Sequence, residues 1–151
     1  IPLPLPPPGT IIRQEKGDRH NPAMRANFML LAQYAGQIQN GGPTISNVFR
    51  LHHVPSFPAP FEAYVALELE IDPQEVGRHE LLLRIIDEDG IPLREANMIA
   101  EFRARPTLGP NYVYATPRLS TLVRRPGIHR LDLIWHDQVI SERTFEVVGP
   151  Q

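Results

Sequence analysis

A chain of 151 residues with a formal net charge of −2 and a pI near 6.3 is long enough for one domain with a hydrophobic core. Its charge balance does not favour a nucleic-acid partner. The chain has no Cys, so disulfides and thiolate metal sites are excluded and the cellular compartment is left open. No apolar run reaches the roughly 20 residues that a membrane span requires.

Residues 1–24 differ in composition from the rest and are predicted to form an extended arm and a linker. Residues 1–10 read IPLPLPPPGT, and their five prolines favour a polyproline II path. The interleaved apolar residues are unlike those of a solvated linker, so we expect the arm to lie on an apolar surface. This surface belongs either to a partner subunit or to the chain's own sandwich. Because the domain is expected to use its own apolar residues internally, a groove on another protein or another copy is favoured. The predicted partner-binding residues are Ile1, Leu3, Leu5, Pro6, Pro7 and Pro8.

Residues 25–151 are predicted to form the folded domain, which opens with a buried strand at 26–34. The Gly-rich segment 36–42 predicts a hairpin connection or a loosely twisted strand end, because glycine adopts positive φ freely. A return strand is expected at 44–53. The three prolines of segment 54–60 exclude a central strand and predict a crossover between sheets.

The next run, 61–71, alternates apolar and charged residues with the period of two that marks a half-buried strand. A further strand is expected at 80–87. Glu88-Asp89-Gly90 predicts a hairpin turn of the Asp-Gly type. The return strand is expected at 91–105, with an irregularity near Asn97.

The last third of the chain is expected to add a strand at 112–123, interrupted by Pro117, and a closing hairpin at 127–148. Trp135 carries the largest apolar group of the chain and is predicted to lie almost fully buried at the centre of the core. Alternation places two sets of residues on opposite faces of the hairpin's first strand: Leu131, Leu133 and Trp135 inward, and Arg130, Asp132 and His136 mainly outward.

No segment of ten or more residues has an apolar period of 3.6, and strands recur every 8–15 residues with Pro and Gly between them. These features predict an all-β, two-sheet antiparallel β-sandwich of seven to nine strands.

Four segments carry a resemblance to a known family: NFMLLAQYA at 27–35, VFRLHHVPSFPAP at 48–60, IIDEDGIPL at 85–93 and the ending at 126–147. In this order they resemble a widespread family of small bacterial domains of unknown function, over residues of about 25–148. The resemblance implies an immunoglobulin-like sandwich and supplies no catalytic residues. Two positions depart from the family pattern, where Gln33 replaces an Asp and Gly42-Pro43 replaces a Gly-Lys hairpin.

His52 and His53 are the first candidates for chemistry. Adjacent residues of a strand point to opposite faces, and no third ligand has the spacing that zinc sites use, so we expect no shared metal. Asp87-Glu88-Asp89, with Asp72 as partner, is a candidate calcium site, although the Asp-Gly turn already explains Asp89.

Two further kinds of site are considered. No serine lies in a Gly-x-Ser-x-Gly elbow and no Gly-rich phosphate loop is present, so enzymatic activity is not expected. The later arginines form either a basic patch or, as we favour, a scattered solvated surface; they are Arg103, Arg105, Arg118, Arg124 and Arg125.

The sequence therefore predicts a non-catalytic structural or accessory subunit that binds no nucleic acid. It is expected to dock on a partner protein or another copy through its N-terminal arm and a sheet surface. The alternative is a ligand-binding sandwich module with calcium or carbohydrate at the loops.

Overall fold

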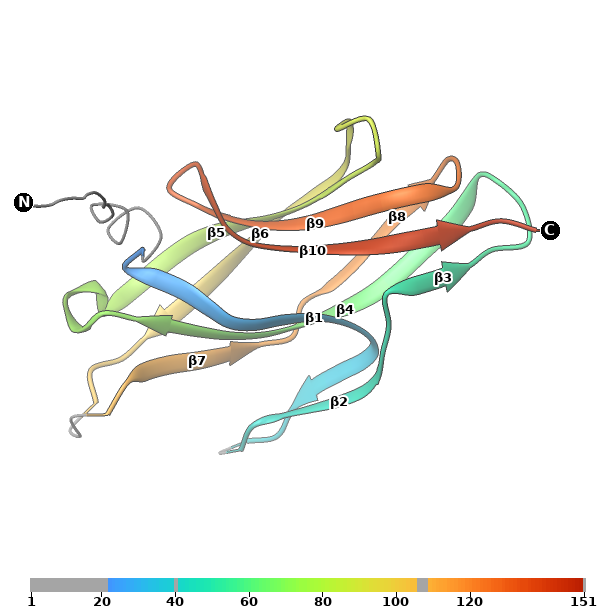
Figure 1. Cartoon of the computed structure of the whole chain (residues 1–151). Coiled ribbons are helices and arrows are strands. Elements are labelled where there is room, and N and C mark those ends of the chain that lie inside the picture. Colours follow the sequence, from blue (N-terminus) through green and yellow to red (C-terminus); the bar gives the residue numbers. More distant parts are fainter. Residues whose placement is uncertain (1–21, 40, 106–108, 151) are drawn as a thin grey trace, which may run out of the picture.

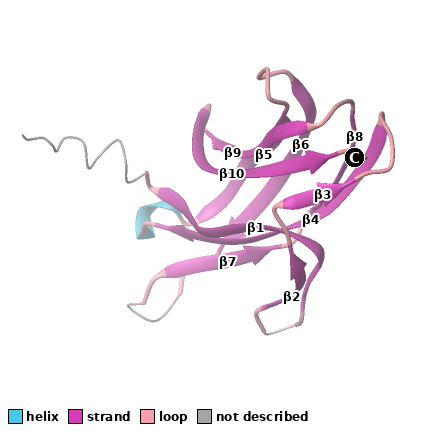
Figure 2. Cartoon of the chain, turned by 45° about the vertical axis from the view of Figure 1, so that its right-hand side comes forward, coloured by secondary structure: helices cyan, strands magenta, loops and turns pink. Residues whose placement is uncertain are grey.

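The structure, a computed structural model, describes residues 22–39, 41–105 and 109–150. The predicted partner-binding residues of the arm lie outside the described residues; they are Ile1, Leu3, Leu5, Pro6, Pro7 and Pro8. Strands make up all the regular secondary structure of the described residues apart from one short helical turn at Pro73–Glu75 (Figure 2). Within these ranges no helix has the length and apolar character needed to cross a membrane.

Two sheets of five strands face each other as a β-sandwich (Figure 1). The first sheet has the order β2-β1-β4-β7, with β8 also pairing with β4; its strands are β1 (Met24–Gln37), β2 (Pro43–Val48), β4 (Ala59–Ile71), β7 (Asn111–Ala115) and β8 (Arg118–Val123). The second sheet has the order β3-β10-β9-β5-β6; its strands are β3 (Leu51–His53), β5 (Gly77–Ile86), β6 (Pro92–Phe102), β9 (Gly127–Trp135) and β10 (Gln138–Val148).

The core lies between the two sheets and is formed by alternate residues of the central strands. Phe61 of β4 stacks on Phe145 of β10 with ring centroids 4.8 Å apart, and both side chains are fully buried. Trp135 is 7% exposed, which confirms its predicted burial. It lies at the last residue of β9, however, so the phenylalanines occupy the centre that the sequence had assigned to the indole.

The described residues form more strands than the predicted seven to nine, because two expected strands are each divided. The expected strand 44–53 changes sheet: Phe49 N donates to Leu31 O in the first sheet, and Arg50 O accepts from Glu146 N in the second. Asn47 has φ = 57°, which turns the backbone just before this step. The short strand β3 then runs parallel to β10, so the sandwich is not wholly antiparallel.

The expected strand 112–123 is likewise two strands, because the chain leaves the ladder at Thr116-Pro117. Both β7 and β8 pair with β4, one after the other, and the Pro117 carbonyl accepts a hydrogen bond from Val65 N between them. The irregularity expected near Asn97 is also misplaced, because β6 is regular there and the register shifts at Ile85/Ile86 instead.

The predicted turn between β5 and β6 is confirmed. Gly90 has φ = 83° and its N–H donates to the Asp87 carbonyl. Asp87 Oδ1 accepts from the backbone N–H groups of Asp89 and Ile91, both at 2.9 Å. The carboxylate of Asp87 thus holds the loop closed.

Candidate binding face

All four tyrosines of the chain lie on the outer face of the first sheet. Tyr112 and Tyr114 pair with Glu70 and Glu68, whose neighbours Leu67 and Leu69 on β4 point into the core. Because side chains alternate along a strand, Tyr112 and Tyr114 point outward. The same alternation places Tyr64 on this face, and its ring lies 5.3 Å from that of Tyr34. We call this surface the tyrosine face.

The rings of the tyrosine face form two groups along the sheet. At one end Phe28, Tyr114 and Tyr112 follow one another, with ring centroids 6.5 Å and 5.7 Å apart. The Arg105 guanidinium stacks on Tyr112 at 4.9 Å from the ring centroid, a cation–π contact. Tyr34 and Tyr64 form the second group. Tyr34 is 50% exposed and Tyr112 is 36% exposed, so both offer ring surface to a ligand.

The two other types of aromatic residue are distributed differently. The single Trp lies in the core, and five of the six Phe residues lie in the core or pack against it; they are Phe49, Phe57, Phe61, Phe102 and Phe145. Only Phe28 joins the tyrosines outside. Tyrosine, which has a polar tip, therefore occupies the solvent-facing positions.

A network of charged and amide groups lies beside the first group of rings. Arg25 donates to Glu70 Oε2 at 2.9 Å and to Asp72 Oδ1 at 3.0 Å, while Asn27 donates to both Glu68 and Glu70. The hydrogen bond from Asn27, and then the one from Arg25, lower the pKa of Glu70. Arg25 is the single cation among these groups against three carboxylates, so the network keeps a net negative charge, although each carboxylate has a hydrogen-bond partner within it.

The hydroxyl of Tyr114 belongs to the same network. Its hydrogen bond to Glu68 raises the pKa of Tyr114, because the carboxylate favours the protonated phenol. Tyr114 is therefore held in place by a partner on β4, and its ring has a defined orientation.

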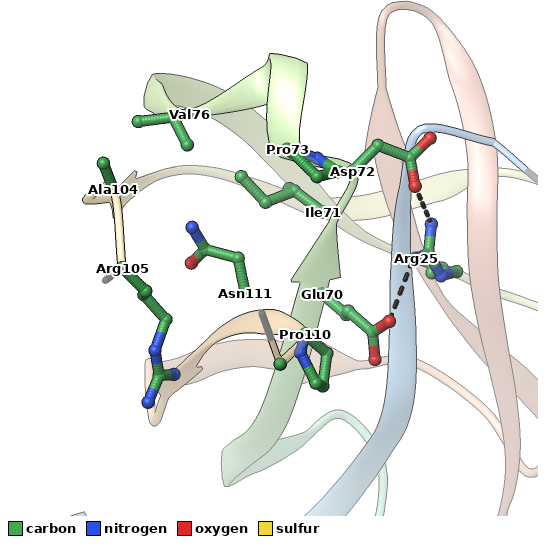
Figure 3. Close-up of a pocket in the computed structure, with 11 residues that line it drawn as sticks. Arg25, Glu70, Ile71, Asp72, Pro73, Val76, Ala104, Arg105, Pro110 and Asn111 are labelled. Atoms are coloured by element: carbon green, nitrogen blue, oxygen red, sulfur yellow. Dashed lines mark hydrogen bonds and ion pairs between the residues drawn. The ribbon is translucent and has the colours of Figure 1, made fainter. Parts of the chain in front are cut away.

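A cavity of about 450 Å³ opens at this end of the face (Figure 3). Its described walls combine the Arg25–Glu70–Asp72 ion pairs with apolar surface, including Ile71, Pro73, Val76 and Pro110. Asn111 also lines it and donates to the Arg103 carbonyl at 3.0 Å. The cavity lies beside the start of β1, at the edge of the tyrosine face.

The two candidate histidines have separate environments. His52 packs its ring against Phe61, with centroids 5.2 Å apart, whereas His53 is exposed. Burial lowers the pKa of His52. Among the described residues, no three side chains of His, Asp and Glu come together in a way that could hold a metal ion.

The candidate calcium residues are also separated. Asp72 ends β4 and pairs with Arg25, whereas Asp87 follows the far end of β5. The ten residues of β5 span about 33 Å between them. Asp89 pairs with Arg125, so the acids of this loop have partners of their own.

The later arginines form no single patch. Arg103 and Arg105 follow β6, at the end of the sandwich where β4 finishes. Arg124 and Arg125 follow β8, at the opposite end, where β4 begins. The scattered arrangement that the sequence favoured is confirmed.

Sequence reasoning did not identify the tyrosine face. The spacing of Tyr112 and Tyr114, two residues apart on one strand, was a usable signal because it places both rings on one face. The positions of Tyr34 and Tyr64 on the same face required the pairing of β1 with β4.

Comparison with known proteins gives a family and a fold. Residues 27–148 match DUF6941, a family of unknown function. No curated protein matches the sequence. Among solved structures, a β-glucosidase from Listeria innocua in complex with glucose aligns with TM-score 0.51 and 11% identity, over 83% of this chain and 16% of that chain. A glycosyl hydrolase family 2 member from Bacteroides cellulosilyticus aligns with TM-score 0.52 and 12% identity, over 83% and 15%. The chain spans about one sixth of these proteins, and the likeness concerns the fold alone.

Proposed function

The chain belongs to the family of unknown function DUF6941, so its role must come from its own geometry, and we propose that it is a non-catalytic binding subunit. It docks on a partner protein, and the tyrosine face is the docking surface. The observation that carries this proposal is the gathering of all four tyrosines on one outer sheet face. Side chains on the outer face contribute little to the packing of the core, so the presence of four tyrosines there is better explained by an interface.

The composition of the face supports a protein partner. Tyr and Arg are enriched at the centres of protein interfaces, where Lys is depleted. The face presents Tyr34 and Tyr112 to solvent, and Arg105 lies on the Tyr112 ring. Exposed apolar groups on the same sheet widen the patch, namely Val48 of β2 and Leu122 of β8, 45% and 50% exposed.

We also infer that the sandwich is of the immunoglobulin-like type. In immunoglobulin domains the second sheet has the strand order G-F-C, extended by C′ in variable-type domains. The order β10-β9-β5-β6 corresponds to G-F-C-C′, and β1-β4 corresponds to A-B of the other sheet. Loops and faces of such sandwiches commonly serve recognition.

The test compares the proteins captured by three forms of the full chain. The first is the wild type, and the second carries Tyr34→Ser and Tyr112→Ser. The matched control carries Ile128→Ser and Val139→Ser, which change residues of similar exposure on the outer face of the other sheet. We expect one protein to be retained by the wild type and the control and lost from the tyrosine variant. Equal capture by all three forms would refute the docking surface.

Two further measurements test whether the partner is another copy of the chain and whether the protein binds calcium. Mass by size-exclusion chromatography over a concentration series shows whether the partner is another copy. A rise in melting temperature on adding calcium would favour the ligand-binding alternative, since a ligand that binds the folded state stabilises it.

A further inference from the structure

We infer that the tyrosine face is a binding site for proline-rich extended segments, and that residues 1–10 of the same chain are its resident occupant. The inference rests on the proposed function, because it names the chemistry of what the face binds. Four features carry it: the chemistry of the segment, that of the face, the charge on each, and the place where the chain enters the sheet.

The segment offers hydrogen-bond acceptors and few donors. Half of IPLPLPPPGT is proline, which has no N–H, while every residue keeps its carbonyl. Proline also favours polyproline II, whose carbonyls point outward without internal hydrogen bonds. A surface that holds such a segment must supply apolar faces for the rings and donors for the carbonyls.

The tyrosine face supplies both. Pyrrolidine rings and leucine side chains can lie on the exposed ring surfaces of Tyr34 and Tyr112, and tyrosine hydroxyls donate to carbonyls. This explains why tyrosine stands at these outer positions while phenylalanine is mostly kept to the core: a Phe ring would offer the apolar face without the donor. Aromatic-lined surfaces are the usual receptors for proline-rich segments.

The carboxylates of the face already have partners there, which is compatible with an uncharged ligand. Residues 1–10 have no charged side chain. On the face, Glu62 pairs with Arg118, and Glu70 pairs with Arg25. A neutral segment therefore leaves these pairs intact, whereas a charged one would have to compete with them.

The lengths also match. Tyr64 and Glu70, which lies opposite Tyr112, are six residues apart on β4, or about 20 Å. Ten residues of polyproline II span about 31 Å. The segment is thus long enough to contact both groups of rings along the sheet.

The described chain enters the sheet next to the site. Arg25, near the start of β1, pairs with Glu70 of β4, and Glu70 pairs with Tyr112 of β7. Two strand spacings of about 5 Å each therefore separate Arg25 from Tyr112. Segment 11–21 has 11 residues and can span at most about 36–40 Å when extended, which is enough for residues 1–10 to fold back. A short tether gives an effective concentration in the millimolar range, which favours docking within one chain over docking between copies.

The sequence alone favoured a groove on another protein or another copy over the chain's own sandwich, on the premise that the sandwich mostly uses its own apolar residues internally. The exposed tyrosines remove that premise. A partner that binds the face would then displace the arm, so its own contact segment should have similar proline-rich chemistry.

The absence of Cys from the chain makes a direct test simple, because Thr10→Cys creates a single labelling site in the 151 residues. A nitroxide on this cysteine broadens nuclear magnetic resonance signals of residues near it. We expect selective loss of the signals of β1 and β7 around Phe28 and Tyr114, with the signals of Ile128 and Val139 on the other sheet retained. Uniform loss, or loss centred on the second sheet, would overturn the inference.

Two variants test the chemistry without emptying the face. Tyr34→Phe with Tyr112→Phe keeps both rings and removes two donors, so signal loss should weaken while the fold is unchanged. Changing Pro6, Pro7 and Pro8 to Ala removes the stiffness of the segment and should reduce the signal loss to a similar extent. Signal loss that is the same in wild type and both variants would contradict proline recognition by tyrosine.

A mixed sample separates docking within one chain from docking between copies. The nitroxide is placed on unlabelled protein, and the signals are read from isotope-labelled protein without nitroxide. We expect these signals to keep their intensity; broadening that appears between copies and not within one would overturn the intramolecular assignment. The two tests can also give different answers. If the nitroxide broadens the signals of β1 and β7 selectively, but the tyrosine variant captures the same partner as the wild type, the proposed function is refuted and this inference is retained.

Discussion

The carboxylate of Asp132 has no exposed surface, although its neighbours Leu131 and Leu133 point into the core and Asp132 points away from it. Arg130 covers it with two hydrogen bonds, Nε to Oδ1 at 2.7 Å and a terminal nitrogen to Oδ2 at 3.1 Å. Arg84 of the neighbouring strand adds an ion pair at 3.5 Å. The sequence correctly predicted an outward direction for Asp132 and could not reveal its burial, which depends on the side chains of two strands.

Loss of this carboxylate should destabilise the fold. Asp132→Ala leaves two guanidinium groups close together without their shared acceptor, at an expected cost of about 1–3 kcal/mol. Glu62→Ala is the control, because the side chains of Glu62 and of its partner Arg118 are both more than half exposed, so that their ion pair should contribute little to stability. Urea denaturation measures both. Equal losses in the free energy of unfolding for the two variants would show that the burial of Asp132 does not increase its contribution to stability.

Removal of the indole should have a larger effect. Trp135→Ala deletes a buried side chain that packs edge-on against His79, with centroids 5.6 Å apart. The lost transfer energy and the cavity predict a cost of about 3–5 kcal/mol. Val139→Ala, on an exposed position of β10, should change the free energy of unfolding by less than about 0.5 kcal/mol. A small effect at Trp135 would mean that the end of the sandwich collapses easily.

At the scale of elements, the turns fix where each strand begins. The β9–β10 hairpin closes through His136 and Asp137, which have φ of 51° and 63°, so that Trp135 pairs with Gln138. Two successive positive φ values define a type I′ turn, whose twist matches that of the strands. The sequence predicted a polar break between the two strands of this hairpin. It did not predict the backbone conformation of the turn, which depends on how the two strands pair.

Gly127 begins β9 and provides an element-scale prediction. Its φ is 136°, and a Cβ there would lie 3.1 Å from Glu88 Oε2. Gly127→Ala should therefore cost about 1–3 kcal/mol through backbone strain. Gly42→Ala is the matched control, because its Cβ would meet the Tyr114 ring at an ordinary 3.8 Å and should be nearly neutral. Thermal melting of the two variants tests the difference, and a neutral Gly127→Ala would show that the turn relaxes.

At the scale of the whole molecule, stability should depend on pH in two separate ranges. Burial lowers the pKa of His52 below its usual 6.5, so its contribution is complete above about pH 6.5 and is lost as the pH falls towards the folded-state pKa. Hydrogen bonds from Asn27 and Arg25 lower the pKa of Glu70 below 4.5, so its contribution is lost only in more acidic solution.

His52→Gln separates the two ranges. The variant should show a smaller fall in melting temperature between pH 7 and pH 5 than the wild type, because a glutamine takes up no proton. Its loss of stability below pH 4.5 should be unchanged, since Glu70 is retained. A pH profile identical to that of the wild type would show that His52 does not contribute to the first range.

The all-β class, the two-sheet architecture and the position of the Asp87–Gly90 turn could all be predicted from the sequence. These features depend on alternation within one strand and on the φ preferences of single residues, which are local properties. The burial of Trp135 follows in the same way from its place in an apolar alternation.

Which strands are neighbours became known from the three-dimensional structure, and the candidate site depends on this strand pairing. Segment 44–53 reads as one strand because its alternation continues, and its division between two sheets is set by pairing with β1 and β10. Tyr34, Tyr64, Tyr112 and Tyr114 are spread over 81 positions of the chain and meet because β1 and β7 both pair with β4. Pairing between distant strands is a property of the whole core, and no single segment encodes it.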